Sequence, residues 1–137
     1  INSLSKTMGT ADYIISMSEG FLTPALLPAI IFVISAIMAF ATGSSWGTFA
    51  ICMPIALPLA FTFTGGELGT LVYACFGAVA GGGVFGDHCS PLSDTTVLSS
   101  TGSASDHIDH VQTQLPYALC CGTLAVILYL VIGFAFV

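Results

Sequence analysis

The chain has 137 residues, of which 55% are hydrophobic and only 6% are charged, and its mean hydropathy is +0.99. Because an ordinary soluble domain is about 25% charged, so few charges cannot form a water-facing surface. The composition therefore predicts a single integral membrane domain, residues 1–137, built of helices. A net charge of −6 with one basic residue excludes a nucleic-acid-binding surface, which requires clustered Lys and Arg.

Four apolar segments are at or near the length of a bilayer-spanning helix, which needs roughly 20 apolar residues. Residues 1–18 precede them and predict a short interfacial helix or loop. The apolar segments are residues 21–41, 49–63, 68–85 and 116–137. We therefore expect an all-α membrane fold with about four transmembrane segments and one broken or re-entrant helix element. The apolar run continues to the last residue, so we expect either a fragment or a chain that works with a partner.

A polar interruption at residues 42–48 separates the first two apolar segments. Its hydroxyl groups belong to Thr42, Ser44, Ser45 and Thr48, and its two glycines favour unwinding. Unwound backbone inside a membrane is tolerated only where protein or a water-lined cavity surrounds it. Hydroxyls and freed carbonyls there would be ligands for a small cation. The alternative is a tight turn between two helices at the membrane surface, because Gly-Ser turns are common.

A second polar segment, residues 86–96, follows directly on a glycine-rich apolar helix. Pro91 disfavours helix at the residue before it, so we expect a helix, an unwound turn and a new helix starting near Leu92. Ser90 would be the N-cap of the new helix, with Pro91 at its first position. Asp94 would then fall in the first turn, where a carboxylate suits the helix dipole.

The same segment contains the ligand types that suit Na⁺, which are carboxylate, hydroxyl and carbonyl oxygens. Charged side chains within membrane segments are rare, which favours a functional role for Asp87 and Asp94. A carboxylate in a low-dielectric site can hold a proton or a sodium ion, but not both. That competition would explain the exchange of Na⁺ for H⁺ at one site. The alternative is a solvent-exposed loop between two membrane helices.

A third polar patch contains two Asp-His pairs, at residues 106–107 and 109–110. The two histidines could chelate a metal, but the spacing shows no third and fourth ligand. We expect instead an amphipathic interfacial helix within residues 105–114, with Ile108 facing the membrane, capped by Ser105 or Asp106. The five cysteines predict neither a disulfide framework nor a zinc site, and we expect no cofactor.

Three stretches resemble the NhaC family of sodium/proton antiporters. The run ATGSSWGTFAICMPIA at residues 41–56 is similar to one family segment. The run GDHCSPLSDTTVLSS at residues 86–100 resembles the family motif GD-x-x-SP-x-SDTT, and DHIDHVQTQLPYA at residues 106–118 resembles the segment that follows it. Together the matches cover about a third of the chain, in the family's order and spacing.

The resemblance implies the C-terminal half of an inverted-repeat transporter in a bacterial or archaeal inner membrane. The motif is expected to bind the transported Na⁺ and H⁺, with Asp87 and Asp94 as the expected Na⁺ ligands. The candidate residues are Asp87, Ser90, Ser93, Asp94, Thr95 and Thr96. Residues 42–48 would be the partner element at the membrane midplane. One half should not complete a transport cycle alone, so the missing half, or a second copy in a homo-oligomer, is the expected partner besides membrane lipid.

Three other functions remain open. The same architecture could exchange a small organic carboxylate such as malate or lactate, coupled to Na⁺ or H⁺. A non-transporting membrane subunit would tolerate neutralisation of both aspartates. A membrane-embedded protease would need Asp87 and Asp94 to share one proton, and only their proximity in sequence supports that. The chain has no phosphate-binding loop or dinucleotide fingerprint, and we do not expect an enzyme.

Overall fold

The computed structural model describes residues 23–136, and every regular element in that part of the chain is an α-helix. The prediction for residues 1–18 lies outside the described residues. The helices are α3 (Leu27–Thr42), α4 (Ser45–Phe63), α5 (Thr70–Cys89), α6 (Asp94–Gly102) and α7 (His107–Phe136). The all-helical prediction is thereby confirmed for residues 23–136.

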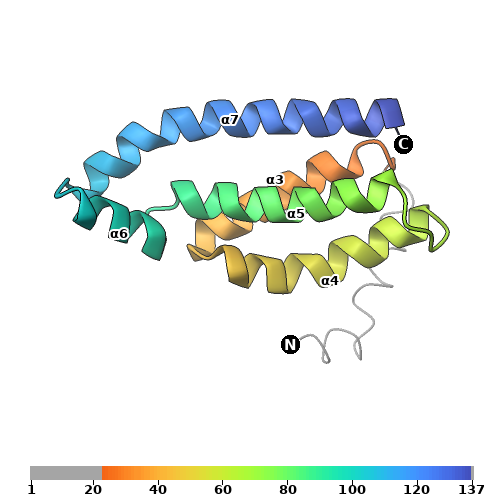
Figure 1. Ribbon diagram of the computed structural model, residues 1–137, viewed down its shortest axis with the longest axis horizontal. Coiled ribbons are helices and arrows are strands. Elements are labelled where there is room, and N and C mark those ends of the chain that lie inside the picture. The colour runs from red at the N-terminus through yellow and green to blue at the C-terminus, as the bar shows by residue number, and fades with distance from the viewer. Residues whose placement is uncertain (1–22, 137) are drawn as a thin grey trace.

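Three of these helices, α4, α5 and α7, are long and apolar enough to cross a membrane. Helix α3 is apolar as well, but it has only 16 residues. The prediction of about four spans therefore becomes three by length, with α3 as a shorter fourth helix. Pro54 and Pro58 lie inside α4, which bows along its length in Figure 1. A proline in a helix removes one hydrogen bond and bends the axis.

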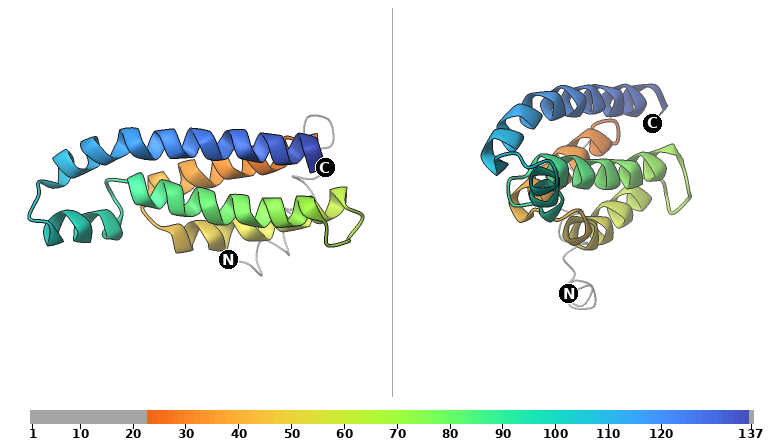
Figure 2. Two further views of the ribbon diagram at one scale, coloured as in Figure 1. Left: turned by 45° about the horizontal axis from the view of Figure 1, so that its top comes forward. Right: turned by 60° about the vertical axis from the view of Figure 1, so that its left-hand side comes forward.

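Helices α3 and α5 run side by side in the same direction, and α4, which connects them along the chain, runs in the opposite direction and contacts both (Figure 1). Helix α7 runs opposite to both along their other side, as the two further views also show (Figure 2). It contacts α3 and α5, whereas among the described helices α4 and α7 do not touch. Helix α6 lies beyond the end of α5 and, of the helices within residues 23–136, contacts only α5 and α7.

A stripe of small residues brings α5 unusually close to α3. A side-chain carbon at Gly82 would collide with the carbonyl oxygen of Phe32, and one at Gly86 would collide with that of Ala36. Both contacts join residues 50 positions apart, as expected for two parallel helices in register. Glycines four apart allow this approach because membrane helices associate through close backbone packing. The hydrophobic core lies beside this stripe, between α3, α4 and α5.

Helix α7 corrects the expected separation of an interfacial helix at 105–114 from a membrane span at 116–137. It is one continuous helix of 30 residues with Pro116 inside it, and its N-terminal part curves away in Figure 1. The Asp106 carboxylate caps it by accepting from the backbone amides of Ile108, at 2.8 Å, and Asp109, at 3.3 Å. This confirms Asp106 as the cap.

Candidate functional site

The polar segment after α5 forms a break of four residues between two helices. Helix α5 ends at Cys89 and α6 begins at Asp94. The N-cap of α6 is Ser93, so the expectation of a cap at Ser90 with Pro91 at the first helical position was wrong. Residues 90–93 instead form a turn in which the Ser93 amide donates to the Ser90 carbonyl at 3.3 Å. The break exists as predicted, but the second helix starts later.

The Ser90 hydroxyl holds the break against α3. Its Oγ donates to the Phe40 carbonyl at 2.7 Å and accepts from the Leu92 amide at 3.1 Å. The Phe40 carbonyl belongs to the last turn of α3, whose carbonyls lack partners within the helix. Ser90 is fully buried and continues the stripe of Gly82 and Gly86, again 50 residues from its partner.

Asp87 lies in the last turn of α5, immediately before the break, and is 9% exposed. Its Oδ1 accepts a hydrogen bond of 2.7 Å from the buried Ser93 hydroxyl. Ser93 Oγ lies 2.7 Å from Thr95 Oγ1, and Thr95 is exposed. When Asp87 is ionised, Ser93 must donate its one proton to the carboxylate, and Thr95 must then donate to Ser93. A row of hydroxyls thus leads from the surface to a buried carboxylate.

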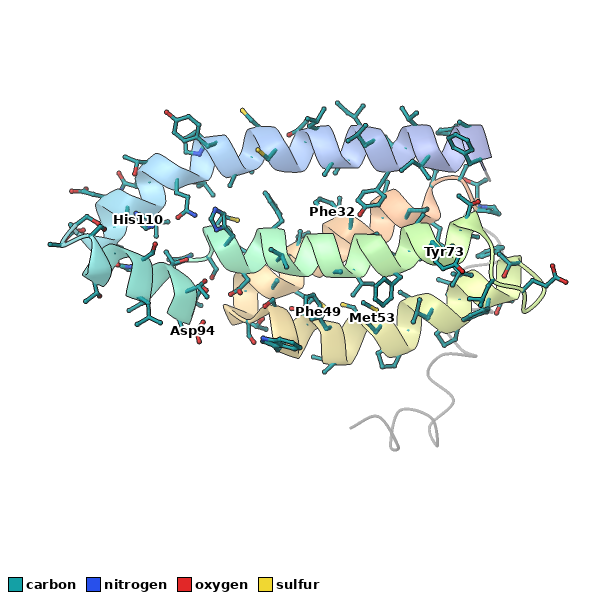
Figure 3. The ribbon with its side chains drawn as sticks, in the orientation of Figure 1. Phe32, Phe49, Met53, Tyr73, Asp94 and His110 are labelled. Atoms are coloured by element: carbon teal, nitrogen blue, oxygen red, sulfur yellow. The ribbon has the colours of Figure 1, made fainter. Side chains whose placement is uncertain are left out.

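The structure separates the two aspartates that the sequence paired. Asp94 is exposed in the first turn of α6, where its charge suits the helix dipole as expected. Figure 3 shows its side chain at the start of α6, on the side that faces away from α7. Over residues 23–136, no hydrogen bond joins Asp94 to Asp87 and no group of three or more His, Cys, Asp or Glu side chains could hold a metal ion.

Residues 42–48 form a tight turn rather than an unwound segment, so the alternative reading of this motif applies. Only Gly43 and Ser44 lie outside the helices, and Gly43 adopts a left-handed φ of 66°. The hydroxyls that we expected to be ligands serve the local backbone: Thr42 Oγ1 donates to Met38, Thr48 Oγ1 donates to the Ser44 carbonyl, and Ser44 Oγ accepts from Gly47. Ser45 lies in the first turn of α4.

The tight turn nevertheless lies directly beside the break. A side-chain carbon at Gly43 would stand 2.7 Å from the backbone carbon and oxygen of Leu92. The two polar motifs, which are about 45 residues apart in the sequence, therefore meet through their backbones. No hydroxyl of residues 42–48 bonds to Asp87 or Ser93, and a joint role of the two motifs in ion binding stays a prediction.

Three further side chains donate to backbone carbonyls in the break or in the last turn of α5 before it. Two of these side chains come from α7. The His88 carbonyl accepts from Thr96 Oγ1, at 3.2 Å, and from Gln114 Nε2, at 3.1 Å. The Pro91 carbonyl accepts from His107 Nε2 at 2.8 Å. Sequence reasoning named Thr96 but missed the roles of His107 and Gln114. No spacing rule could have found them, because the partners lie 16 and 26 residues apart.

Comparison with known proteins gives these observations a family. The sequence model of the Na⁺/H⁺ antiporter family matches residues 1–134. The chain belongs to the Na⁺/H⁺ antiporter family. It is a membrane protein of a family whose members are transporters rather than enzymes, in agreement with its apolar helices. No solved structure matches the chain at a significant level.

Three relatives illustrate the range of the family. The chain is 48% identical, over 99% of its length, to an uncharacterised protein of Haemophilus influenzae. It is 37% identical, over 91% of its length, to the arginine/ornithine antiporter ArcD of Halobacterium salinarum. It is 34% identical, over 93% of its length, to the malate-2H⁺/Na⁺-lactate antiporter of Bacillus subtilis. In each case it spans about a quarter of the relative, 25%, 25% and 26%.

Proposed function

We propose that this chain forms the ion-binding part of a secondary antiporter of the NhaC type, in the C-terminal half of the transporter, and that Na⁺ and H⁺ compete for Asp87. The observation that carries the proposal is the buried Asp87 carboxylate at a helix break, with a hydroxyl bonded to it. Discontinuous helices are the usual place for coupling-ion sites in secondary transporters. The family match supports cation exchange as the activity.

The hydrogen bonds describe how the site would change its occupant. With Asp87 ionised, Ser93 donates to Oδ1, and no hydrogen bond among residues 23–136 occupies the other carboxylate oxygen, Oδ2. A sodium ion would bind at that oxygen, beside hydroxyls at the break. Protonation of Asp87 removes its charge and releases the ion, while the Ser93–Thr95 row offers the proton a path to the surface.

The four helix ends at the site leave the carboxylate as its dominant charge. Helices α3 and α5 end there, which places partial negative charge, and α4 and α6 begin there, which places partial positive charge. These contributions oppose each other, so the net preference for a cation comes from Asp87. A fixed negative charge of this kind in a membrane is expensive unless it has an occupant or a partner.

The complete transporter must supply what this chain lacks. The chain spans about a quarter of its relatives' length, and α7 leaves most of its apolar surface uncovered. We propose that lipid and the remaining helices, or a second copy, cover this surface in a bacterial or archaeal inner membrane. Relatives from two bacteria and an archaeon support that location.

The experiment is Na⁺-driven proton movement in sealed proteoliposomes that contain the full-length transporter. We expect Na⁺ to collapse a preset pH gradient, and Asp87→Asn to abolish the effect because the amide can neither carry the charge nor exchange the proton. Asp94→Asn is the matched control, since that carboxylate is exposed, and we expect a much smaller loss. Equal loss in both variants would contradict the assignment to Asp87, and no Na⁺-dependent flux in the wild type would reject Na⁺/H⁺ exchange.

The second candidate is exchange of a small organic carboxylate or amino acid, which the names of two relatives suggest. Its structural support is the N-terminus of α6, where the N-cap Ser93 makes no capping hydrogen bond. The first backbone N–H groups of α6 therefore receive no bond from that side chain, and a substrate carboxylate could bind them. Against it, Asp94 already occupies the first turn, and residues 23–136 contain no Lys or Arg. Proteoliposomes without Na⁺-dependent flux would next be loaded with malate and tested for lactate exchange.

A further inference from the structure

His107 connects the start of α7 to the break between α5 and α6. Its Nε2 lies 2.8 Å from the Pro91 carbonyl oxygen, which can only accept a hydrogen bond. Nε2 therefore carries a hydrogen and donates it. The Pro91 carbonyl lies in the turn at 90–93, and His107 is its only hydrogen-bond donor within residues 23–136. The imidazole thus supplies the hydrogen-bond donor for a carbonyl that the break leaves without a helical partner.

The second ring nitrogen fixes the imidazole to α6. His107 Nδ1 lies 3.2 Å from the hydroxyl of Ser100, which is 2% exposed. That hydroxyl has one proton, which it can donate to Nδ1 or to the Val97 carbonyl, 2.9 Å away, but not to both at once. Both nitrogens consequently have a partner within reach, one in the turn and one in the helix that follows it. The ring holds the turn at 90–93 in a fixed position relative to α6, and Ser93, which bonds Asp87, lies at the junction of the two.

This role is distinct from starting α7 or from covering apolar surface. Asp106 already caps the helix, so His107 is not needed for that purpose. His110 lies one turn further along α7, and its ring makes no hydrogen bond within the described residues. Figure 3 shows it on the part of α7 above α6. The two histidines that the sequence paired as possible metal ligands therefore differ, and His110 provides an internal control.

We propose that His107 is a positioning residue for the ion site, which holds the turn at 90–93 so that the Ser93 hydroxyl stays on the Asp87 carboxylate. The inference rests on the proposed function, because the site it serves is the one assigned there to Na⁺ and H⁺. Without the imidazole the Pro91 carbonyl loses its donor, and the turn is free to move relative to α6. The Ser93 hydroxyl would then spend less time in the geometry that completes the site.

The test uses the full-length transporter in proteoliposomes, with Na⁺ concentration varied. His107→Leu and His107→Met remove the donor, whereas His107→Gln retains an N–H that can reach Pro91. We expect the apparent KM for Na⁺ to rise roughly three- to tenfold in the first two, the size expected for losing one part-buried hydrogen bond. We expect kcat to change much less, His107→Gln to restore most of the affinity, and His110→Leu to resemble the wild type. A KM that is equal in His107→Leu, His107→Met and His110→Leu would overturn the proposal.

A second measurement does not depend on transport. Cys89 is 4% exposed and adjoins the turn, so its reaction with a maleimide reports on the position of the turn. In full-length protein with Cys89 as its one cysteine, we expect His107→Leu to accelerate labelling and His110→Leu to leave the rate unchanged. Unchanged labelling rates in both variants would overturn the proposal that His107 holds the turn in place. If the wild type shows no Na⁺ flux but His107→Leu still labels faster than His110→Leu, the proposed function is rejected, whereas the role of His107 in holding the turn stands.

Discussion

The α3–α5 interface and the α6–α7 end are closed by different kinds of contact. Between α3 and α5, Gly82 and Gly86 lie against backbone oxygens, and no flexible group intervenes. At the other end, α6 and α7 are joined to the break by the side chains of Thr96, His107 and Gln114. The first region leaves no room for adjustment, whereas the second is held by hydrogen bonds that can be broken singly.

The ion site proposed here lies where these two regions meet. Asp87 and Ser90 belong to the close-packed side, since Ser90 bonds the last turn of α3. Ser93 and Thr95 belong to the side held by side chains, as the N-cap and first turn of α6. A site divided in this way can change when one part moves relative to the other. We therefore expect single changes in the first region to lower stability most, and single changes in the second to affect ion affinity more than stability.

The largest effect on stability should come from Gly86→Val. The added carbon atoms would collide with the Ala36 carbonyl and with the Ala39 side chain, and the backbone oxygen cannot move without moving α3. We expect a loss at the upper end of the ~1–3 kcal/mol typical of overpacking. Thermal unfolding of the purified full-length transporter in detergent would measure it.

The matched control is Gly102→Ala at the end of α6, where an added side-chain carbon meets nothing within 4 Å. Alanine is the better helix former, so we expect a change within about 0.5 kcal/mol, in either direction. A similar loss of stability at both glycines would show that the two regions do not differ in the way described above.

Ser90→Ala should have the next largest effect, because within residues 23–136 it removes the only side-chain hydrogen bond between α3 and the break. The Phe40 carbonyl would lose its donor in a part-buried hydrogen bond, which costs about 0.5–1.5 kcal/mol. Ser99→Ala is the control, since Ser99 is exposed and its hydroxyl bonds nothing in the described part of the chain. Thermal unfolding of the two variants would decide. Equal stability would mean that the α3–α5 packing holds the break without Ser90.

Much of the fold could be predicted from the sequence because long apolar segments indicate membrane helices. The helices α4, α5 and α7 follow from those two properties. The boundaries were less accessible, and α7 shows why. Pro116 and the charged residues before it suggested two elements, but a proline can lie inside a helix at the cost of one hydrogen bond and a bend. The start of α6 was misplaced for a related reason, because Ser90 is bound to α3 instead of capping a helix.

The candidate site was predictable in its residue types but not in its geometry. The motif at 86–96 indicated carboxylates and hydroxyls, yet nothing in the spacing separates a buried Asp87 from an exposed Asp94. That difference depends on the turn at 90–93, which aims Ser93 back at Asp87. The contributions of Phe40, His107 and Gln114 depend on helix packing, because their partners lie 50, 16 and 26 residues away.

The smallest effect on stability should come from Gln114→Leu, because a second side chain donates to the same carbonyl as Gln114. Gln114 Nε2 donates to the His88 carbonyl, but Thr96 Oγ1 donates to the same oxygen. Gln114 Nε2 also lies 2.6 Å from the ring Nε2 of His88, but that contact is exposed, so water can replace it. In addition, Gln114 Oε1 is buried without a partner, so the substitution also removes an unsatisfied acceptor. We expect a change in unfolding free energy within about 0.5 kcal/mol, since an unpaired buried group offsets the lost bond.

Thr96→Val in the same background shows whether the two donors substitute for each other. Each single variant leaves the His88 carbonyl with one side-chain donor, whereas the double variant leaves it with none. We expect the double variant to lose more stability than the sum of the two single changes, with a coupling of about 0.5–3 kcal/mol. If the two losses of stability are simply additive, the His88 carbonyl must find another hydrogen-bond donor in the double variant. Such a replacement would mean that the α6–α7 end can rearrange, unlike the α3–α5 interface.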